Sequence, residues 1–256
     1  MAKIFCIANQ KGGVGKTTTA VNLAAGLAAH QQRVLLVDLD PQGNATMGSG
    51  IDKHHLEHSI YQILIGLSSV SESKIRSESG GYDVVPANRH LAGAEVELVD
   101  MDGRELRLKA ALDLVGADYD FILIDCPPAL SLLTLNGLCA ANGVIVPMQC
   151  EYFALEGLSD LVNTIKQVHA NLNPSLTIIG LLRVMFDPRT ALQQQVSEQL
   201  IQHFGDKVFE TIIPRNVRLA EAPSYGMPGV IFDKSSKGAK AYVQFGAEMI
   251  ERIKTM

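Results

Sequence analysis

Residues 11–19 (KGGVGKTTT), near the N-terminus, combine the residue types that bind phosphate. An apolar run at residues 4–8 precedes them, and an alanine- and leucine-rich segment with helical spacing follows at residues 20–29. The glycines let backbone N–H groups turn inward around an anion, and the N-terminus of the following helix adds its partial positive charge. The order of strand, glycine-rich turn and helix therefore predicts a phosphate-binding loop.

Two side chains of this loop are expected to act directly on a nucleotide. Lys16 would reach the β- and γ-phosphates, and the Thr17 hydroxyl would ligate Mg²⁺. The residues expected to surround the phosphates are Gly12, Gly13, Val14, Gly15, Lys16, Thr17 and Thr18. An ordinary glycine-rich turn is the structural alternative, and the full combination in this context disfavours it.

The start of the loop departs from the common P-loop pattern G-x-x-x-x-G-K-[ST]. That pattern has a glycine five residues before Gly15, where this chain has Gln10, and a second lysine, Lys11, comes next. Lys11 is too early in the loop to share the duty of Lys16, because the loop wraps the phosphates between them. Its ammonium could reach outward across a nucleotide, including one bound by a facing subunit.

Acidic residues end two of the predicted strands. Asp125 follows the apolar residues 121–124, as a Walker B aspartate does, and would hold Mg²⁺ through its water shell. Asp38 and Asp40 follow the second strand, and Asp40 is the candidate for orienting the attacking water or assisting the metal. Turn chemistry around Pro41 is the alternative for both, and the nearby phosphate loop favours function.

The order of the predicted elements indicates the fold class. Apolar strands are predicted at residues 4–8, 33–38, 82–86, 120–125, 143–147, 176–184 and 207–211. Helical patterns lie between them, with strongly amphipathic ones at residues 155–168 and 242–253. Repeated βαβ units predict an α/β fold: a single doubly wound, mostly parallel sheet with helices on both faces, in one domain over residues 1–256.

Composition excludes several classes of protein. The chain has a formal net charge of −5, which argues against coating nucleic acid through bulk charge but leaves a local basic patch open. No secretory leader or membrane-spanning run is predicted. The four cysteines lack C-x-x-C spacing, so we expect core thiols in a reducing cytoplasm rather than disulfides or zinc ligands: Cys6, Cys126, Cys139 and Cys150.

Five motifs together resemble the ParA/Soj-type partition ATPases of the ParA/MinD superfamily, whose P-loop carries the deviant early lysine. They lie at residues 11–19, 38–46 (DLDPQGNAT), 124–128 (IDCPP), 149–158 (QCEYFALEGL) and 213–223 (IPRNVRLAEAP). The resemblance spans almost the whole chain in the same order. Because the chain begins close to the phosphate loop, we do not expect the helix-turn-helix domain of the large plasmid forms, or operator repression.

The resemblance implies an activity and its partners. Members hydrolyse ATP with Mg²⁺, form an ATP-dependent sandwich homodimer, and then bind double-stranded DNA without sequence preference. A ParB-type centromere-binding protein stimulates hydrolysis and releases them. The expected role is chromosome or plasmid partition by a cytoplasmic, nucleoid-associated protein with no stable membrane association.

The resemblance also implies roles for individual residues. Lys11 would act in trans on the nucleotide of the neighbouring subunit, and Gly12 would lie at the dimer seam. Pro214 and Asn216 would line the adenine pocket. The arginines that would contact DNA phosphates are Arg189 and Arg218.

Two other functions use a similar loop. A membrane-cycling ATPase of the MinD kind needs a basic amphipathic tail, and the basic residues of the last helix are Lys237, Lys240, Arg252 and Lys254. Glu248 and Glu251 dilute that basic face, so a packed helix is the simpler interpretation. A nitrogenase-reductase-like electron carrier needs cysteines that bridge a cluster across a dimer; Cys126 and Cys139 are available but lack a matching context.

Overall fold

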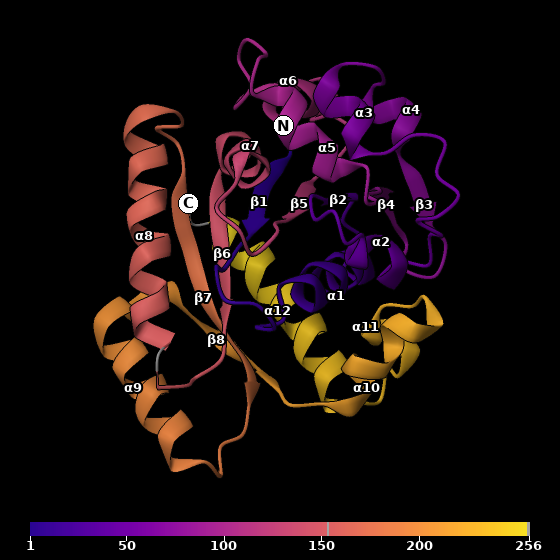
Figure 1. Cartoon of the computed structure of the whole chain (residues 1–256). Coiled ribbons are helices and arrows are strands. Elements are labelled where there is room, and N and C mark those ends of the chain that lie inside the picture. Colours follow the sequence, from indigo (N-terminus) through magenta and orange to yellow (C-terminus); the bar gives the residue numbers. More distant parts are fainter. Residues whose placement is uncertain (153, 255–256) are drawn as a thin grey trace.

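Eight strands form one sheet in the order β3-β4-β2-β5-β1-β6-β7-β8 (Figure 1). The computed structural model describes residues 1–152 and 154–254. The strands are β1 (Lys3–Ile7), β2 (Val34–Asp38), β3 (Ile75–Ser77), β4 (Tyr82–Val85), β5 (Phe121–Asp125), β6 (Gly143–Met148), β7 (Thr177–Phe186) and β8 (Val208–Pro214). All neighbouring strands pair in parallel except β3 and β4, so the sheet is the mostly parallel one predicted.

Helices cover both faces of the sheet. They are α1 (Lys16–Ala29), α2 (Asn44–Gly48), α3 (Ile60–Ile65), α4 (Val70–Ser73), α5 (Leu91–Leu98), α6 (Arg107–Asp113), α7 (Leu132–Ala140), α8 (Ala154–Asn171), α9 (Ala191–Phe204), α10 (Val217–Glu221), α11 (Gly229–Phe232) and α12 (Lys237–Lys254), with 3₁₀ turns η1 (Gly205–Lys207) and η2 (Ala222–Tyr225). None of these described helices is long and apolar enough to span a bilayer.

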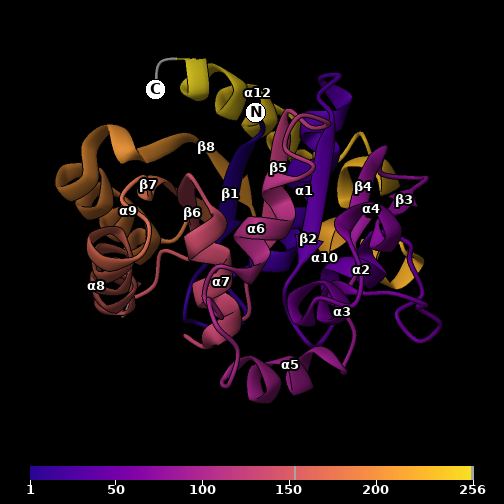
Figure 2. The same ribbon diagram turned by 90° about the horizontal axis from the view of Figure 1, so that it is seen from above.

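Alternating side chains of the central strands pack in two separate hydrophobic cores, one on each face of the sheet. In β1, Phe5 and Ile7 pack with α1 and α12, whereas Ile4 and Cys6 pack with the helices of the other face. In Figure 2, α12 lies on one side of the strands and α5, α7 and α8 lie on the other. Burial on both faces explains why the strands appear in the sequence as continuous apolar runs.

Helices α1 and α12 pack very closely, and glycines make this possible. A Cβ on Gly26 would lie 2.8 Å from the carbonyl oxygen of Tyr242, and one on Gly246 would lie 3.1 Å from the Gly26 backbone. The Tyr242 hydroxyl also shares a 3.0 Å hydrogen bond with Thr19. These contacts hold α1, whose first turn belongs to the phosphate loop.

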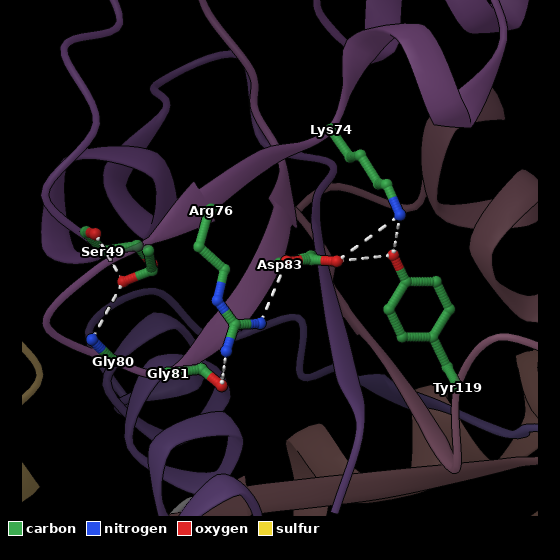
Figure 3. Close-up of polar contacts among 8 residues, drawn as sticks. Ser49, Lys74, Arg76, Gly80, Gly81, Asp83 and Tyr119 are labelled. Carbon is green, nitrogen blue, oxygen red and sulfur yellow. Dashed lines mark hydrogen bonds and ion pairs between the residues drawn. The ribbon is translucent and has the colours of Figure 1, made fainter.

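The edge strand β3 was not predicted from the sequence, because three residues carry no usable periodicity. It pairs antiparallel with β4, and a polar cluster around Asp83 holds it (Figure 3). Asp83 accepts hydrogen bonds from Arg76 at 3.0 Å and from the Tyr119 hydroxyl at 2.8 Å. Lys74 donates to the Tyr119 hydroxyl at 2.9 Å. The other seven strands match their predicted ranges to within three residues.

Candidate active site

The phosphate loop joins β1 to α1 at the carboxyl edge of the sheet. Gly13 and Gly15 have φ values of 74° and 78°, a conformation that strongly favours glycine. Lys16 begins α1, and its Nζ atom folds back to donate a 3.0 Å hydrogen bond to the Lys11 carbonyl oxygen. The ammonium therefore lies over the loop, where the phosphates of a nucleotide would be held.

Asp125, the last residue of β5, is a buried carboxylate whose hydrogen-bonding capacity is unmet. It is 1% exposed, and neither carboxylate oxygen makes a hydrogen bond within the described residues. Burial, followed by the neighbouring charge of Asp38, raises its pKa well above the ordinary value. The Thr17 hydroxyl is close enough to lower that pKa, so a hydroxyl and a carboxylate converge here. Such oxygen donors suit Mg²⁺.

Asp38 is the matching residue of β2, directly beside Asp125 in the parallel register. Its carboxylate accepts hydrogen bonds from the Asp40 backbone N–H at 3.1 Å and from the backbone and hydroxyl of Thr46 at 2.8 and 2.7 Å. Burial raises its pKa to about 6, and these hydrogen bonds oppose that shift. For Asp38 the turn-forming interpretation therefore fits the geometry.

Asp40 lies on the loop that Asp38 organises. Its Oδ1 atom accepts a 2.9 Å hydrogen bond from the Gln42 backbone, and the side chain is half-buried. Burial lowers the pKa of Lys16, while the nearby carboxylates of Asp125 and Asp40 act in the opposite direction. Lys16, Asp125 and Asp40 are thus brought together from three separate segments.

The loop between β6 and α8 also contacts the phosphate loop, which the sequence motifs did not reveal. Lys11 forms an ion pair with Glu151 at 2.5 Å, and the Gln149 amide donates to the Gly13 carbonyl oxygen at 3.1 Å. Phe153 of the same motif lies outside the described residues. Ligands bind beyond the carboxyl ends of parallel strands, so the residues after the predicted strand at 143–147 could have been expected near the site.

A cavity of about 290 Å³ opens beside the phosphate loop. Pro214 and Asn216 line it together with Gly15 and Thr18 of the loop and α1. Asn216 also caps α10, since its side chain accepts a 3.3 Å hydrogen bond from the Leu219 backbone. The two residues expected near a base therefore share one cavity with the expected phosphate site.

The two arginines expected to contact DNA lie outside this cavity, on the surface. Arg189 is 88% exposed and forms a two-pronged pair with Asp187 at 2.9 and 2.7 Å, which lowers the pKa of Asp187 to about 2. Arg218 is 56% exposed and lies 2.8 Å from Glu221 and 3.6 Å from Asp233. Both are accessible, but each already has a carboxylate partner.

The glycine-rich loop, the lysine of α1 and the acidic end of β5 lie at the carboxyl edge of one parallel sheet. This arrangement defines a P-loop nucleoside triphosphatase with a second, early lysine. A family model described as an AAA domain matches residues 2–178.

The chromosome partitioning protein ParA of Myxococcus xanthus is 52% identical over 252 residues, covering 98% of this chain and 89% of that protein. The chromosome-partitioning ATPase Soj of Thermus thermophilus is 51% identical over 249 residues, covering 97% of this chain and 96% of that protein. The chain therefore belongs to the ParA/Soj family of chromosome-partitioning ATPases.

A solved structure extends the comparison to bound ligands. A cobyrinic acid a,c-diamide synthase from Mycobacterium smegmatis, with bound ATP analogue and magnesium, superposes with a TM-score of 0.87 at 39% identity. The match covers 99% of this chain and 96% of that one. One fold can host several chemistries, so this match speaks to the fold and to nucleotide binding rather than to the reaction of this chain.

Proposed function

We propose that this chain is an ATP-driven switch for DNA partition. MgATP drives formation of a sandwich homodimer that binds double-stranded DNA without sequence preference. Hydrolysis, stimulated by a ParB-type centromere-binding partner, resets the switch during chromosome or plasmid segregation. The observation that carries the proposal is the unsatisfied Asp125 beside Thr17 and Lys16, in a chain about half identical to partitioning ATPases.

The residues at the loop fit MgATP. Lys16 exchanges its hydrogen bond to the Lys11 carbonyl for phosphate oxygens, and the loop N–H groups surround the same oxygens. Thr17 and Asp125 would hold Mg²⁺, which neutralises charge on the β- and γ-phosphates when bound. Within the described residues the buried carboxylate oxygens of Asp125 make no hydrogen bond, and a bound metal would meet this need.

Asp40 is proposed to orient the attacking water. The Gln42 backbone fixes one of its carboxylate oxygens, and Lys16 lies nearby. The water oxygen forms the new bond to the γ-phosphorus while the bond to the bridging oxygen breaks, which releases ADP and phosphate. Positioning and charge stabilisation, rather than covalent chemistry, supply the rate in this class of reaction.

Lys11 is proposed to act on the neighbouring subunit. In the single chain its ammonium pairs with Glu151, on the exposed side of the loop. Dimer formation would replace that carboxylate by a phosphate of the partner's nucleotide. Gly12 lies next to it, and a Cβ there would meet nothing within 4 Å in the single chain. A Cβ at position 12 is therefore tolerated in the single chain, and a larger residue there would interfere with an approaching second copy.

DNA binding is assigned to Arg189 and Arg218. With a net charge of −5, one chain carries too little positive potential to hold DNA through bulk charge. Both arginines form exposed surface ion pairs, which contribute little to stability, so DNA phosphates can compete for them. Two copies would place four such arginines along one duplex. The DNA-bound dimer would therefore be located at the nucleoid.

Fluorescence anisotropy on unrelated duplexes tests this assignment. ATP, but not ADP, should switch on binding, and each phosphate contact should steepen its decrease with salt. Arg189→Ala and Arg218→Ala should weaken DNA binding while ATP affinity is retained. Arg33→Ala is the matched control, because Arg33 is 57% exposed and pairs with Asp120 at the amino ends of β2 and β5, away from the carboxyl ends of the strands. Equal binding with ATP and ADP would contradict the switch.

The membrane-cycling alternative receives no support from the last helix. The apolar side of α12 buries Tyr242, Phe245 and Met249 in the core shared with α1. A helix whose apolar face is already packed cannot insert that face into a bilayer without unpacking the core. We therefore propose no stable membrane association.

A further inference from the structure

Met185, near the end of β7, has a backbone conformation that non-glycine residues rarely adopt. Its φ is +51°, and among the described residues only Gln31, in the turn after α1, is another non-glycine with positive φ. Residues held in this region carry strain that the surrounding structure must maintain, and such residues cluster at ligand sites.

The strained backbone at Met185 interrupts the alternation of side chains at the end of β7. Leu182 and Val184 face the core that contains α1 and α12, so strand alternation would place Phe186 there as well. Phe186 instead packs in the opposite core, and the pairing of β7 with β8 shifts register between Arg183 and Phe186. Bulges of this kind re-aim side chains next to functional sites.

The Met185 side chain lines the cavity beside the phosphate loop. Val184 and Met185, although adjacent in sequence, both line it, and the Met185 methyl carbon lies 3.6 Å from where a Cβ of Gly15 would be. The Gln149 amide holds the thioether through a 3.0 Å contact with its sulfur, and the same amide bonds the Gly13 carbonyl oxygen. The sulfur is thus fixed relative to the phosphate loop.

We propose that Met185 is a binding residue of the nucleotide site: its thioether forms the wall against which the purine base of ATP packs. The proposal deepens the proposed function and rests on it. A polarisable thioether packs favourably against an aromatic ring. The cavity begins at Gly15 and Thr18, so a triphosphate held by the loop would direct its nucleoside into it.

Calorimetry with MgATP and with magnesium tripolyphosphate separates the base from the phosphates. Met185→Gly, which removes the thioether and tolerates the positive φ, should weaken ATP binding roughly two- to tenfold. Tripolyphosphate binding should be unchanged. Met185→Leu keeps most of the bulk but removes the sulfur, and should give a smaller loss for ATP alone. Gln31→Gly, the matched change at the other positive φ, should alter neither affinity.

Other outcomes would overturn the proposal. An equal loss for ATP and tripolyphosphate in Met185→Gly would make Met185 a support of the phosphate loop, and unchanged ATP affinity would remove it from the base site. A melting curve of each variant checks that the fold is retained. If the unaltered chain binds tripolyphosphate and ATP equally, the base site itself is absent; if it binds neither, the proposed function fails first.

Discussion

The ends of β2 and β5 each carry an aspartate at the same level of the sheet, but the two carboxylates differ in their hydrogen bonding. Asp38 and Asp125 are paired neighbours in the parallel register, and both are buried. The Asp38 carboxylate accepts three hydrogen bonds, whereas that of Asp125 accepts none within the described residues. Hydrogen bonding, rather than residue type or position, distinguishes Asp38 from Asp125, the carboxylate proposed to hold Mg²⁺.

The Asp125 carboxylate lowers the stability of the nucleotide-free chain. A buried carboxylate without partners costs free energy unless it is protonated or a cation arrives. Asp38 is satisfied by the chain itself and shapes the loop that carries Asp40. Asp125 is left for a ligand, so the free energy of unfolding of the nucleotide-free chain is lower than it would be with a satisfied group at this position.

Loss of the Asp125 carboxylate or of the Lys16 ammonium should affect activity strongly. Asp125→Asn should lower MgATP turnover roughly 100- to 1,000-fold, because the Mg²⁺ that neutralises the phosphate charge would lose the carboxylate proposed to hold it. Lys16→Ala should abolish tight MgATP binding. Steady-state phosphate release and calorimetry measure these effects, and Asp113→Asn, an exposed carboxylate in α6, is the control. Near-normal turnover in Asp125→Asn would remove it from the metal site.

The same substitution at the two positions should change stability in opposite directions. Asp125→Asn should raise the free energy of unfolding of the nucleotide-free chain by about 1–3 kcal/mol, because a neutral amide costs less to bury. Asp38→Asn should lower the free energy of unfolding by about 1–3 kcal/mol, because the NH2 group of the asparagine would face a backbone N–H, which is also a donor. Urea unfolding without magnesium measures both, and a shift of the same sign would break the comparison.

The pH dependence provides a further test. The pKa of Asp125 is raised in the folded chain, so the folded state binds more protons than the unfolded state above the ordinary value of 3.8. Its contribution to stability is therefore present below pH 3.8 and is lost as the pH rises from 3.8 through the raised pKa of the folded chain. The stabilising effect of Asp125→Asn should be small near pH 4.5 and grow toward pH 7. Urea unfolding across this range checks it, and a pH-independent difference would contradict the assigned shift.

The smallest expected effect concerns the hydrogen bonds of Asp38. The Thr46 hydroxyl donates to Asp38 at 2.7 Å and accepts from the Ala87 backbone at 2.9 Å. Thr46→Val removes both bonds and should cost about 1–2 kcal/mol, whereas Thr46→Ser, which keeps the hydroxyl, should cost less. Equal losses in thermal unfolding would show that methyl packing, not hydrogen bonding, makes Thr46 important.

Local sequence order predicted the part of the site that is local. Residues 11–19 could be found because a strand, a loop and a helix follow one another there, and Asp125 because it ends an apolar strand. The parallel sheet followed from the order of the apolar runs. The contacts of Glu151 and Gln149 with the loop join segments that are 140 and 136 residues apart. No periodicity encodes those contacts, nor the bulge that turns Met185 toward the cavity.

The different hydrogen bonding of Asp38 and Asp125 was also beyond the sequence. Both end an apolar strand, and only the positions of Thr46 and the Asp40 backbone decide which is satisfied. Strand β3 was missed because it is short and is held by the Asp83 cluster rather than by an apolar pattern. The expected roles of Lys11, Arg189 and Arg218 stay predictions, since each depends on a second molecule.

Light scattering measures directly whether MgATP pairs two chains. Asp40→Ala should bind MgATP, hydrolyse it slowly, and accumulate at twice the 27.6 kDa mass of one chain, but not with ADP. Adding Gly12→Val should return it to the single-chain mass with ATP still bound, while Gly93→Val on exposed α5 should not. A single-chain mass for Asp40→Ala in saturating MgATP, or the same dimer with ADP, would contradict the account.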